Sequence, residues 1–286
     1  MKVSNQHPVY FIAEIGQNHQ GDINIAKKMV DSLKGLPISC IKTAKRDIDT
    51  CLSDQQKEMM YDNPNSFGKT YYDHRMALEL SKEHFVELKD YIEAAGFDFI
   101  SSFTDQPSLD FLQEIGITGL KIASQRTSDI ALLNAVANTK LPTILSTGMS
   151  SIGDVDKAVN LLKNNSELHL LQCTSTYPTP ESELNLNVIP MYKKRYKGLV
   201  DTVGFSGHHG GVAPDIAAYM LGSRIIERHY TLSRNMKGTD HPGSLELQGV
   251  EYILKYIDQV NQAMGDSKKY ILDSEMPALK KLRGNR

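Results

Sequence analysis

The chain has 286 residues, of which 40% are hydrophobic and 23% charged, and its formal net charge is −2. These values are typical of a globular protein with one large α/β domain or two small ones. They give no basic footprint for nucleic acid, and no run approaches the ~18 apolar residues of a membrane-spanning helix. Three cysteines, Cys40, Cys51 and Cys173, suit neither a disulfide framework nor a metal motif, so we expect a reducing, cytoplasmic location.

In the first half of the chain, short apolar runs alternate with amphipathic ones. The apolar runs predict strands at 10–16, 39–45, 97–102 and 119–124. Asp22 is a candidate N-cap for the helix after the first strand, and Ser81 for a helix that Gly96 ends. A further helix is expected at 109–115. The stretch 46–80, between the second strand and Ser81, is long, polar and rich in aromatic residues.

The second half continues the alternation. Strands are predicted at 142–148, 168–175, 202–208 and 224–232, and helices at 130–137, after Ser151, at 214–221 and at 250–264. The connection after 168–175 is poorly patterned. Eight strand–helix units predict a (β/α)8 TIM barrel over residues 1–265, followed by a charged C-terminal tail at 266–286. A doubly wound open sheet is the alternative, but no GxGxxG follows the first strand.

Polar residues recur near the C-terminal ends of the predicted strands, where a barrel of this type places its active site. Lys42 and Lys121 lie inside apolar strands, where an unpaired ammonium group is costly. Either each lysine pairs with a buried carboxylate, or the two bind a dianion such as a phosphate. Serines also lie near the C-terminal ends of several predicted strands, although a single serine at a strand end is usually a turn former. These serines are Ser102, Ser124, Ser146, Ser175 and Ser206.

Two histidines lie in neighbouring predicted strands, His208 at the end of 202–208 and His229 inside 224–232. His208 follows FSG and His229 lies in IERHYTL. Adjacent strands lie roughly 5 Å apart, so the two imidazoles could share one divalent metal ion. A buried histidine is more often a hydrogen-bonded core residue, and spacing alone leaves both interpretations open.

Together these segments resemble the sialic acid synthase family. The sequence AEIGQNHQGD at 13–22 is similar to the AEIGxNHxG opening of that family. The resemblance runs from about residue 10 to residue 247, and its motifs follow the order of the family. The remaining motifs are LKIAS (120–124), LSTGMSS (145–151), CTSTYPTP (173–180), FSGHHGG (205–211), IERHYTL (226–232) and GTDHPGSLE (238–246).

The resemblance implies a (β/α)8 enzyme that condenses phosphoenolpyruvate with an aldose, typically an N-acetylated hexose or its phosphate. It also implies release of inorganic phosphate, formation of a nonulosonic acid, and a divalent metal (Mn²⁺ or Mg²⁺) that polarises the aldehyde. His208 and His229 match the family's metal ligands. Phosphoenolpyruvate is expected to contact Lys42, Lys121, Ser124, Ser146 and Ser206, and Ser102 stands where the family usually has threonine. Glu14 is expected beside the reacting carbons, Tyr177 and Asp240 near the sugar, and Ser175 is a further substrate-binding candidate.

Four departures from the family pattern concern the sugar. Gln125 and Arg126 stand where the family has glycine and an acidic residue, Gly207 replaces an aspartate, and Ala44 replaces a glutamine. Many members continue into a small antifreeze-like domain, for which the tail offers no room. We therefore expect the phosphoenolpyruvate chemistry to be kept and the acceptor pocket to be changed, with Arg126 contacting an acidic or phosphorylated sugar.

Two alternatives accompany this prediction. The first is a synthase for a shorter phosphorylated aldose, similar to 3-deoxy-octulosonate 8-phosphate synthase and favoured by Arg126. The second is a non-catalytic sugar-phosphate-binding barrel, which the retained Glu14, lysines and histidines disfavour. We expect no nucleic-acid or membrane partner, and the resemblance suggests a homodimer. The stretch 46–80 follows a strand end and is interpreted as a lid over the acceptor or a plain surface insertion.

Overall fold

The eight strands close into one barrel in the computed structural model, which describes residues 7–284. Each strand is parallel to its neighbours, and β8 pairs with β1. The prediction of a (β/α)8 barrel is therefore confirmed. The strands are β1 (Tyr10–Gly16), β2 (Cys40–Lys45), β3 (Asp98–Phe103), β4 (Leu120–Ile122), β5 (Thr143–Ser146), β6 (Leu168–Cys173), β7 (Thr202–Gly207) and β8 (Ile225–His229).

Helices connect the strands and cover the outside of the barrel. The two caps expected from the sequence are present, since the side chains of Asp22 and Ser81 each accept a backbone N–H in the first turn of the following helix, and Ser151 caps α8 in the same way. The helices are α1 (Ile23–Leu33), α2 (Ile48–Cys51), α3 (Asp54–Glu58), α4 (Tyr71–Leu78), α5 (Lys82–Ala94), α6 (Gln106–Glu114), α7 (Ile130–Thr139), α8 (Ile152–Leu162), α9 (Val188–Arg195), α10 (Ala213–Met220), α11 (Leu247–Ala263) and α12 (Met276–Arg283).

Five strands end earlier than the sequence predicts, among them β5 at Ser146 and β7 at Gly207. β4 ends at Ile122, β6 at Cys173 and β8 at His229, because the residues that follow leave the sheet to form loops over its C-terminal end. After β4, Ser124–Arg126 forms a single 3₁₀ turn. Five helices were not expected, and one of them is α12 in the predicted tail. α2, α3 and α4 lie within 46–80, and α9 lies in the connection after β6; all are too short to show a helical period.

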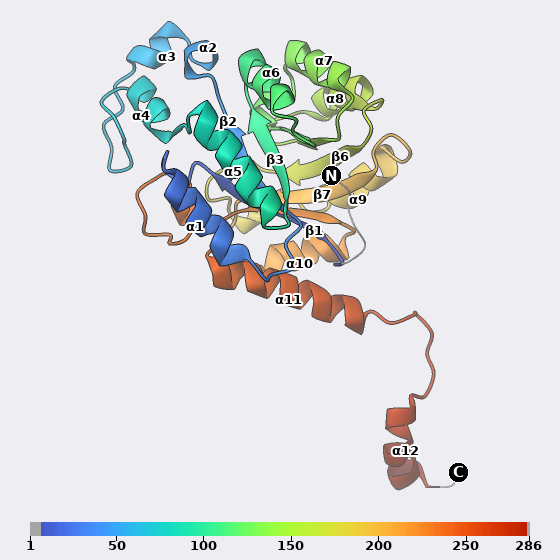
Figure 1. Cartoon of the computed structure of the whole chain (residues 1–286). Helices are drawn as coiled ribbons and strands as arrows, with labels where there is room; N and C mark the ends of the chain where they lie inside the picture. The colour runs from blue at the N-terminus through green and yellow to red at the C-terminus, as the bar shows by residue number, and fades with distance from the viewer. Residues whose placement is uncertain (1–6, 285–286) are drawn as a thin grey trace.

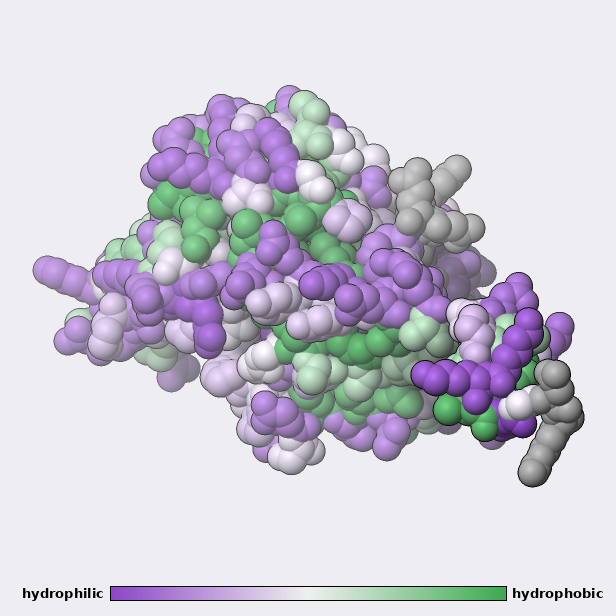
Figure 2. All heavy atoms as spheres, turned by 90° about the horizontal axis from the view of Figure 1, so that it is seen from below, coloured by the Kyte–Doolittle hydropathy of each residue, from purple (hydrophilic) through white to green (hydrophobic). Residues whose placement is uncertain are grey.

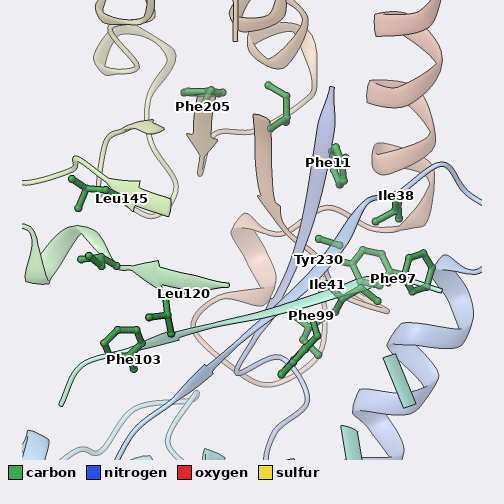
Figure 3. Close-up of a cluster of buried hydrophobic side chains, with 14 of the residues drawn as sticks. Phe11, Ile38, Ile41, Phe97, Phe99, Phe103, Leu120, Leu145, Phe205 and Tyr230 are labelled. Atoms are coloured by element: carbon green, nitrogen blue, oxygen red, sulfur yellow. The ribbon is translucent and has the colours of Figure 1, made fainter. Parts of the chain in front are cut away.

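The core has two layers, one on each face of the barrel wall. The larger layer packs outward-facing strand residues against the helices, and Figure 3 shows Phe99, Leu120 and Leu145 among them. The smaller layer fills the inside of the barrel near the N-terminal ends of the strands. Its members are Tyr10, Ile12, Cys40, Ile100, Ile144, Leu171 and Ile225. This apolar plug leaves the other end of the barrel for polar side chains.

The chain leaves the barrel after α11, and α12 lies apart from it (Figure 1). No residue of α12 is buried. Hydrophobic residues also form a band among hydrophilic ones on the side of the molecule seen in Figure 2. The division into a barrel at 1–265 and a separate tail stays a prediction. Within residues 7–284, no helix combines the length and apolarity that crossing a membrane requires.

Candidate active site

The residues of the site follow from side-chain alternation, because every second residue of a barrel strand faces the interior. Ile12 of β1 and Cys40 of β2 belong to the apolar plug, and the next inward residues are Glu14 and Lys42. Strand register places Glu14 beside Lys42 on one side and beside His229 on the other. The same two-residue step in the other strands produces a polar layer above the plug.

This polar layer lines a cavity of about 320 Å³ at the C-terminal ends of the strands. Every predicted site residue except Arg126 contributes to its wall. Their catalytic and binding roles stay predictions, but the structure brings their side chains together. The twelve are Glu14, Lys42, Ser102, Lys121, Ser124, Ser146, Ser175, Tyr177, Ser206, His208, His229 and Asp240.

Both lysines in the cavity are paired with buried carboxylates. Lys42 contacts Glu14, and Lys121 Nζ lies 2.9 Å from Glu227 Oε1. Ser206 also donates a hydrogen bond to that Glu227 oxygen at 2.9 Å. Glu227 was missed in the sequence analysis, although it lies two residues from His229 in the same strand and therefore had to face the interior. The structure therefore shows the ion pairs of the first alternative, and both lysine side chains line the cavity.

Burial and neighbouring charges shift the pKa values of Lys42 and Glu227. Burial lowers the pKa of Lys42 to about 7, and the neighbouring charge of Lys121 adds to the shift. Burial would raise the pKa of Glu227, but Lys121 and Lys42 outweigh it and hold that pKa at about 2. The carboxylate is therefore ionised at neutral pH and holds the two ammonium groups in the barrel interior.

His208 and His229 converge as predicted, with ring centroids 5.4 Å apart. The Thr174 carbonyl lies 3.2 Å from His208 Nδ1, so that nitrogen donates and Nε2 keeps its lone pair. Burial lowers the pKa of both histidines, which keeps the rings neutral at pH 7. Asp240 Oδ2 is 4.0 Å from His229 Nδ1, a buried atom that lacks a hydrogen-bond partner within residues 7–284.

These features fit a metal ion. Neutral imidazoles with available nitrogens are ligands for divalent transition metals. No group of three or more His, Cys, Asp or Glu side chains suited to a metal occurs in the described part of the chain. A cation would therefore rest on two protein nitrogens and leave its remaining positions to substrate and water.

Serines also line the cavity, and two of their hydroxyls have no hydrogen-bond partner among the described residues. Ser146 Oγ and Ser175 Oγ are buried and have no partner within the described residues. Ser124 Oγ accepts the backbone N–H of Gly148 at 3.0 Å. A Cβ at Gly148 would lie 2.2 Å from Ser175 Oγ and 2.8 Å from Ser124 Oγ, so only glycine fits there. Ser124 and Ser175 thus pack closely against the Gly148 backbone in the cavity wall.

Three predicted sugar contacts differ in their placement. Tyr177 is 55% exposed and packs on His208, with ring centroids 4.1 Å apart, at the cavity mouth. Asp240 lies beside His229, as described above. Arg126 does not line the cavity, because its side chain turns to Asp129 at 3.3 Å, and Gln125 contributes to the wall in its place. The expectation that Arg126 contacts the acceptor therefore has no support from the geometry.

Comparison with known proteins assigns the chain to a family. Residues 29–269 match the model of the NeuB family. The chain belongs to the NeuB family. N-acetylneuraminate-9-phosphate synthase of Homo sapiens is 36% identical over 281 residues, which are 98% of this chain and 78% of that protein. N,N'-diacetyllegionaminic acid synthase of Campylobacter jejuni is 34% identical, over 92% of this chain and 80% of that protein.

Solved structures agree with this assignment. The N-acetylneuraminic acid synthetase of Leptospira borgpetersenii, crystallised with citrate, superposes with a TM-score of 0.80 at 30% identity, covering 98% of this chain and 93% of that one. A truncated 3-deoxy-D-arabino-heptulosonate 7-phosphate synthase of Thermotoga maritima gives 0.68 at 14% identity, with 93% and 90% covered, and shows a shared fold. The resemblance to sialic acid synthases is confirmed, and this NeuB-family protein is an enzyme.

Two cavity residues of this NeuB-family enzyme come from the stretch 46–80. Arg46 follows β2 and Arg75 lies on α4, and both line the cavity. Neither was singled out from the sequence, because a surface arginine in an unpatterned segment carries no local signal. A lid function for 46–80 stays a prediction, whereas the position of Arg75 shows that the segment reaches the cavity.

A buried polar cluster fixes the outer side of the histidine-bearing strands. Arg228 is fully buried and donates to Asp215 Oδ2 at 2.5 Å and to the His209 carbonyl at 2.6 Å. Arg228 precedes His229, and His209 follows His208. The cluster therefore ties β8, the loop after β7 and α10 together behind the two metal-ligand candidates. Gly207 is required here, because a Cβ would lie 2.7 Å from the Phe205 ring.

Proposed function

We propose that this NeuB-family enzyme condenses phosphoenolpyruvate with an aldose, an N-acetylmannosamine-like sugar, to a 3-deoxy-2-keto sugar acid of the nonulosonate type. One observation carries the proposal. Two ammonium groups, unsatisfied serine hydroxyls and two neutral imidazoles converge in one cavity at the catalytic end of the barrel. The named relatives are synthases of N-acetylneuraminate phosphate and of diacetyllegionaminic acid, which supports a product of this class.

Phosphoenolpyruvate fits the floor of the cavity. Its phosphate would bind between Lys42 and Lys121, where charge-assisted hydrogen bonds are strongest away from water. The hydroxyls of Ser146 and Ser175 have no hydrogen-bond partner among the described residues and can donate to the remaining phosphate oxygens. The incoming anion competes with Glu14 and Glu227 for the lysines, so binding redistributes existing pairs.

His208 and His229 would hold a divalent cation, Mn²⁺ or Mg²⁺. Such an ion supplies Lewis-acid polarisation of the acceptor aldehyde when it is bound. The chain itself orients the two rings. The Thr174 carbonyl fixes the His208 tautomer, and Asp240 lies within reach of His229.

The reaction forms one carbon–carbon bond and breaks one carbon–oxygen bond. The enol carbon of phosphoenolpyruvate attacks the aldehyde carbon, and water adds to the carbon that carries the phosphate. Glu14 lies beside Lys42 and is placed to accept a proton from that water once phosphate engages the lysine. Collapse of the tetrahedral intermediate expels inorganic phosphate, whose charge Lys42 and Lys121 stabilise. The net reaction consumes one water molecule.

A phosphate-release assay with phosphoenolpyruvate, Mn²⁺ and a panel of aldoses tests the proposal. Release that depends on an aldose, with the sugar acid found by mass spectrometry, supports it. Absence of release with every aldose would favour the non-catalytic binding barrel. The alternative of a shorter phosphorylated aldose was favoured because Arg126 was expected to contact the acceptor. Arg126 is not part of the cavity wall, so this reason no longer holds. Release with a phosphorylated pentose only would restore it.

Two further features belong to this proposal. A cytoplasmic location agrees with Cys40, Cys51 and Cys173, which are all free thiols. A homodimer is expected from the family resemblance, and light scattering of the purified chain measures it directly.

A further inference from the structure

Two arginines at the cavity have no place in the proposed handling of phosphoenolpyruvate. Arg46 directly follows β2, and Arg75 lies on α4, so both come from the segment at 46–80. The floor lysines Lys42 and Lys121 face the barrel axis and are at most 5% exposed, whereas both arginines are half-buried. The arginines therefore form a second cationic region between the floor and solvent.

This second region carries excess positive charge. Arg75 has no carboxylate within 4.0 Å among residues 7–284, and its hydrogen bonds go to the neutral groups Gln17 and Tyr71. Arg46 lies 3.3 Å from Glu79, but Lys45 lies 3.4 Å from the same carboxylate. Lys45 and Arg46 thus share a single carboxylate, and Arg75 contacts none among the described residues, which favours binding of a further anion.

Both guanidinium groups are held by surrounding structure. Arg75 donates to the Tyr71 hydroxyl through Nε and Nη2, and to Gln17 Oε1 through Nη1 at 2.6 Å. The helix that carries it packs on the loop after β1, since a Cβ at Gly21 would lie 2.3 Å from the Ala77 carbonyl oxygen. Glu79, one turn beyond Arg75, contacts Arg46. The two arginines are therefore parts of one ordered arrangement.

We propose that Arg46 and Arg75 bind a phosphate group at the end of the acceptor sugar that is remote from the aldehyde. Guanidinium groups present paired N–H donors that match phosphate oxygens, and two of them suit a dianion. The aldehyde end would lie at the histidines, with the sugar hydroxyls near Asp240 and Tyr177. This inference rests on the proposed function and narrows its acceptor to a phosphorylated hexose derivative.

The test compares N-acetylmannosamine with its 6-phosphate, each at saturating phosphoenolpyruvate and Mn²⁺. Wild type should prefer the phosphorylated sugar in kcat/KM by about 10- to 100-fold, the range expected for charge-assisted bonds to one phosphate. Arg75→Ala should lose most of that preference through KM of the phosphorylated sugar. Its kcat/KM should fall far more with the phosphorylated sugar than with the unphosphorylated one, its KM for phosphoenolpyruvate should change less than its KM for the phosphorylated sugar, and Arg75→Lys should fall between wild type and Arg75→Ala.

Arg195→Ala is the matched control, because Arg195 is a surface arginine on α9 paired with Asp156. It should keep the wild-type preference, and circular dichroism checks the fold of each variant. A wild-type preference for the unphosphorylated sugar would overturn the inference while leaving the proposed function intact. A larger rise in KM for phosphoenolpyruvate than for the phosphorylated sugar in Arg75→Ala would assign the arginines to phosphoenolpyruvate instead. Absence of phosphate release with either sugar would overturn both proposals together.

Discussion

Replacing Glu227 with glutamine tests how the cavity balances its charge. Glu227 Oε1 accepts hydrogen bonds from Lys121 Nζ and Ser206 Oγ, both at 2.9 Å, and the side chain is buried. Glutamine keeps the size and can still accept from Ser206, but it removes the negative charge that Lys121 and Lys42 share. Within the described residues, Glu14 then remains the only carboxylate that contacts either lysine.

The pKa of Glu227 gives the magnitude. A value of about 2, against an ordinary 4.5, corresponds to roughly 3 kcal/mol of folding free energy at about 1.4 kcal/mol per unit. The pKa is lowered by folding, so this stability is present above pH 4.5 and lost as the pH falls through about 2. It agrees with the ~3–5 kcal/mol expected when one partner of a buried ion pair is removed. The melting temperature should fall by about 6–12 °C, at ~2–4 °C per kcal/mol.

Thermal unfolding with and without ligand measures the effect. In Glu227→Gln, phosphoenolpyruvate or inorganic phosphate should raise the melting temperature more than in wild type, because the anion supplies the missing charge. Asp156→Asn is the control, since it breaks the exposed Arg195 pair and should change stability by less than about 1 kcal/mol. A Glu227→Gln variant as stable as wild type, or with no larger ligand shift, would refute the reasoning.

Three further predictions concern the histidines and the outer cluster. His208→Ala and His229→Ala should each reduce phosphate release by more than about 100-fold with the fold retained by circular dichroism, and full activity in excess chelator would contradict the metal assignment. Burial lowers the pKa of His19 to about 4, so the protein should lose up to about 3 kcal/mol of unfolding free energy as the pH falls from 6.5 to 4. Urea unfolding at several pH values measures this loss, and in His19→Gln the unfolding free energy should depend less on pH. Asp215→Asn should cost about 3–5 kcal/mol by leaving Arg228 unpaired, and a loss below 1 kcal/mol would show that the cluster is not a buried ion pair.

The barrel could be predicted because its signal is periodic and repeated. Eight apolar runs, each followed by an amphipathic run or a capping residue, specify eight strand–helix units without any knowledge of contacts. The caps at Asp22 and Ser81 followed from residue type alone. Strand ends could not be placed as well, since the residues after β4, β6 and β8 remain apolar or small while their backbones turn toward the cavity.

The site residues that could be predicted are those that lie in strands or at strand ends, because the fold alone determines where they face. His208 and His229 lie at strand ends, and Lys42 and Lys121 face inward from within their strands, so their convergence follows from the fold. Glu227 was predictable from its two-residue step to His229, but the pairing of a particular lysine with a particular carboxylate depends on register around the closed barrel. Arg75 was beyond prediction, because its cavity position depends on how α4 packs against the loop after β1.

The two carboxylates also explain how such a cavity can fold before its substrate arrives. An isolated ammonium group inside an apolar barrel would cost several kcal/mol, enough to consume much of the stability of a domain. Glu14 and Glu227 remove that cost by pairing with Lys42 and Lys121. Substrate binding must then exchange these partners for phosphate and carboxylate oxygens. Affinity for the anion is reduced by the strength of the resting pairs, and in return the ammonium groups are already in position when the phosphate leaves.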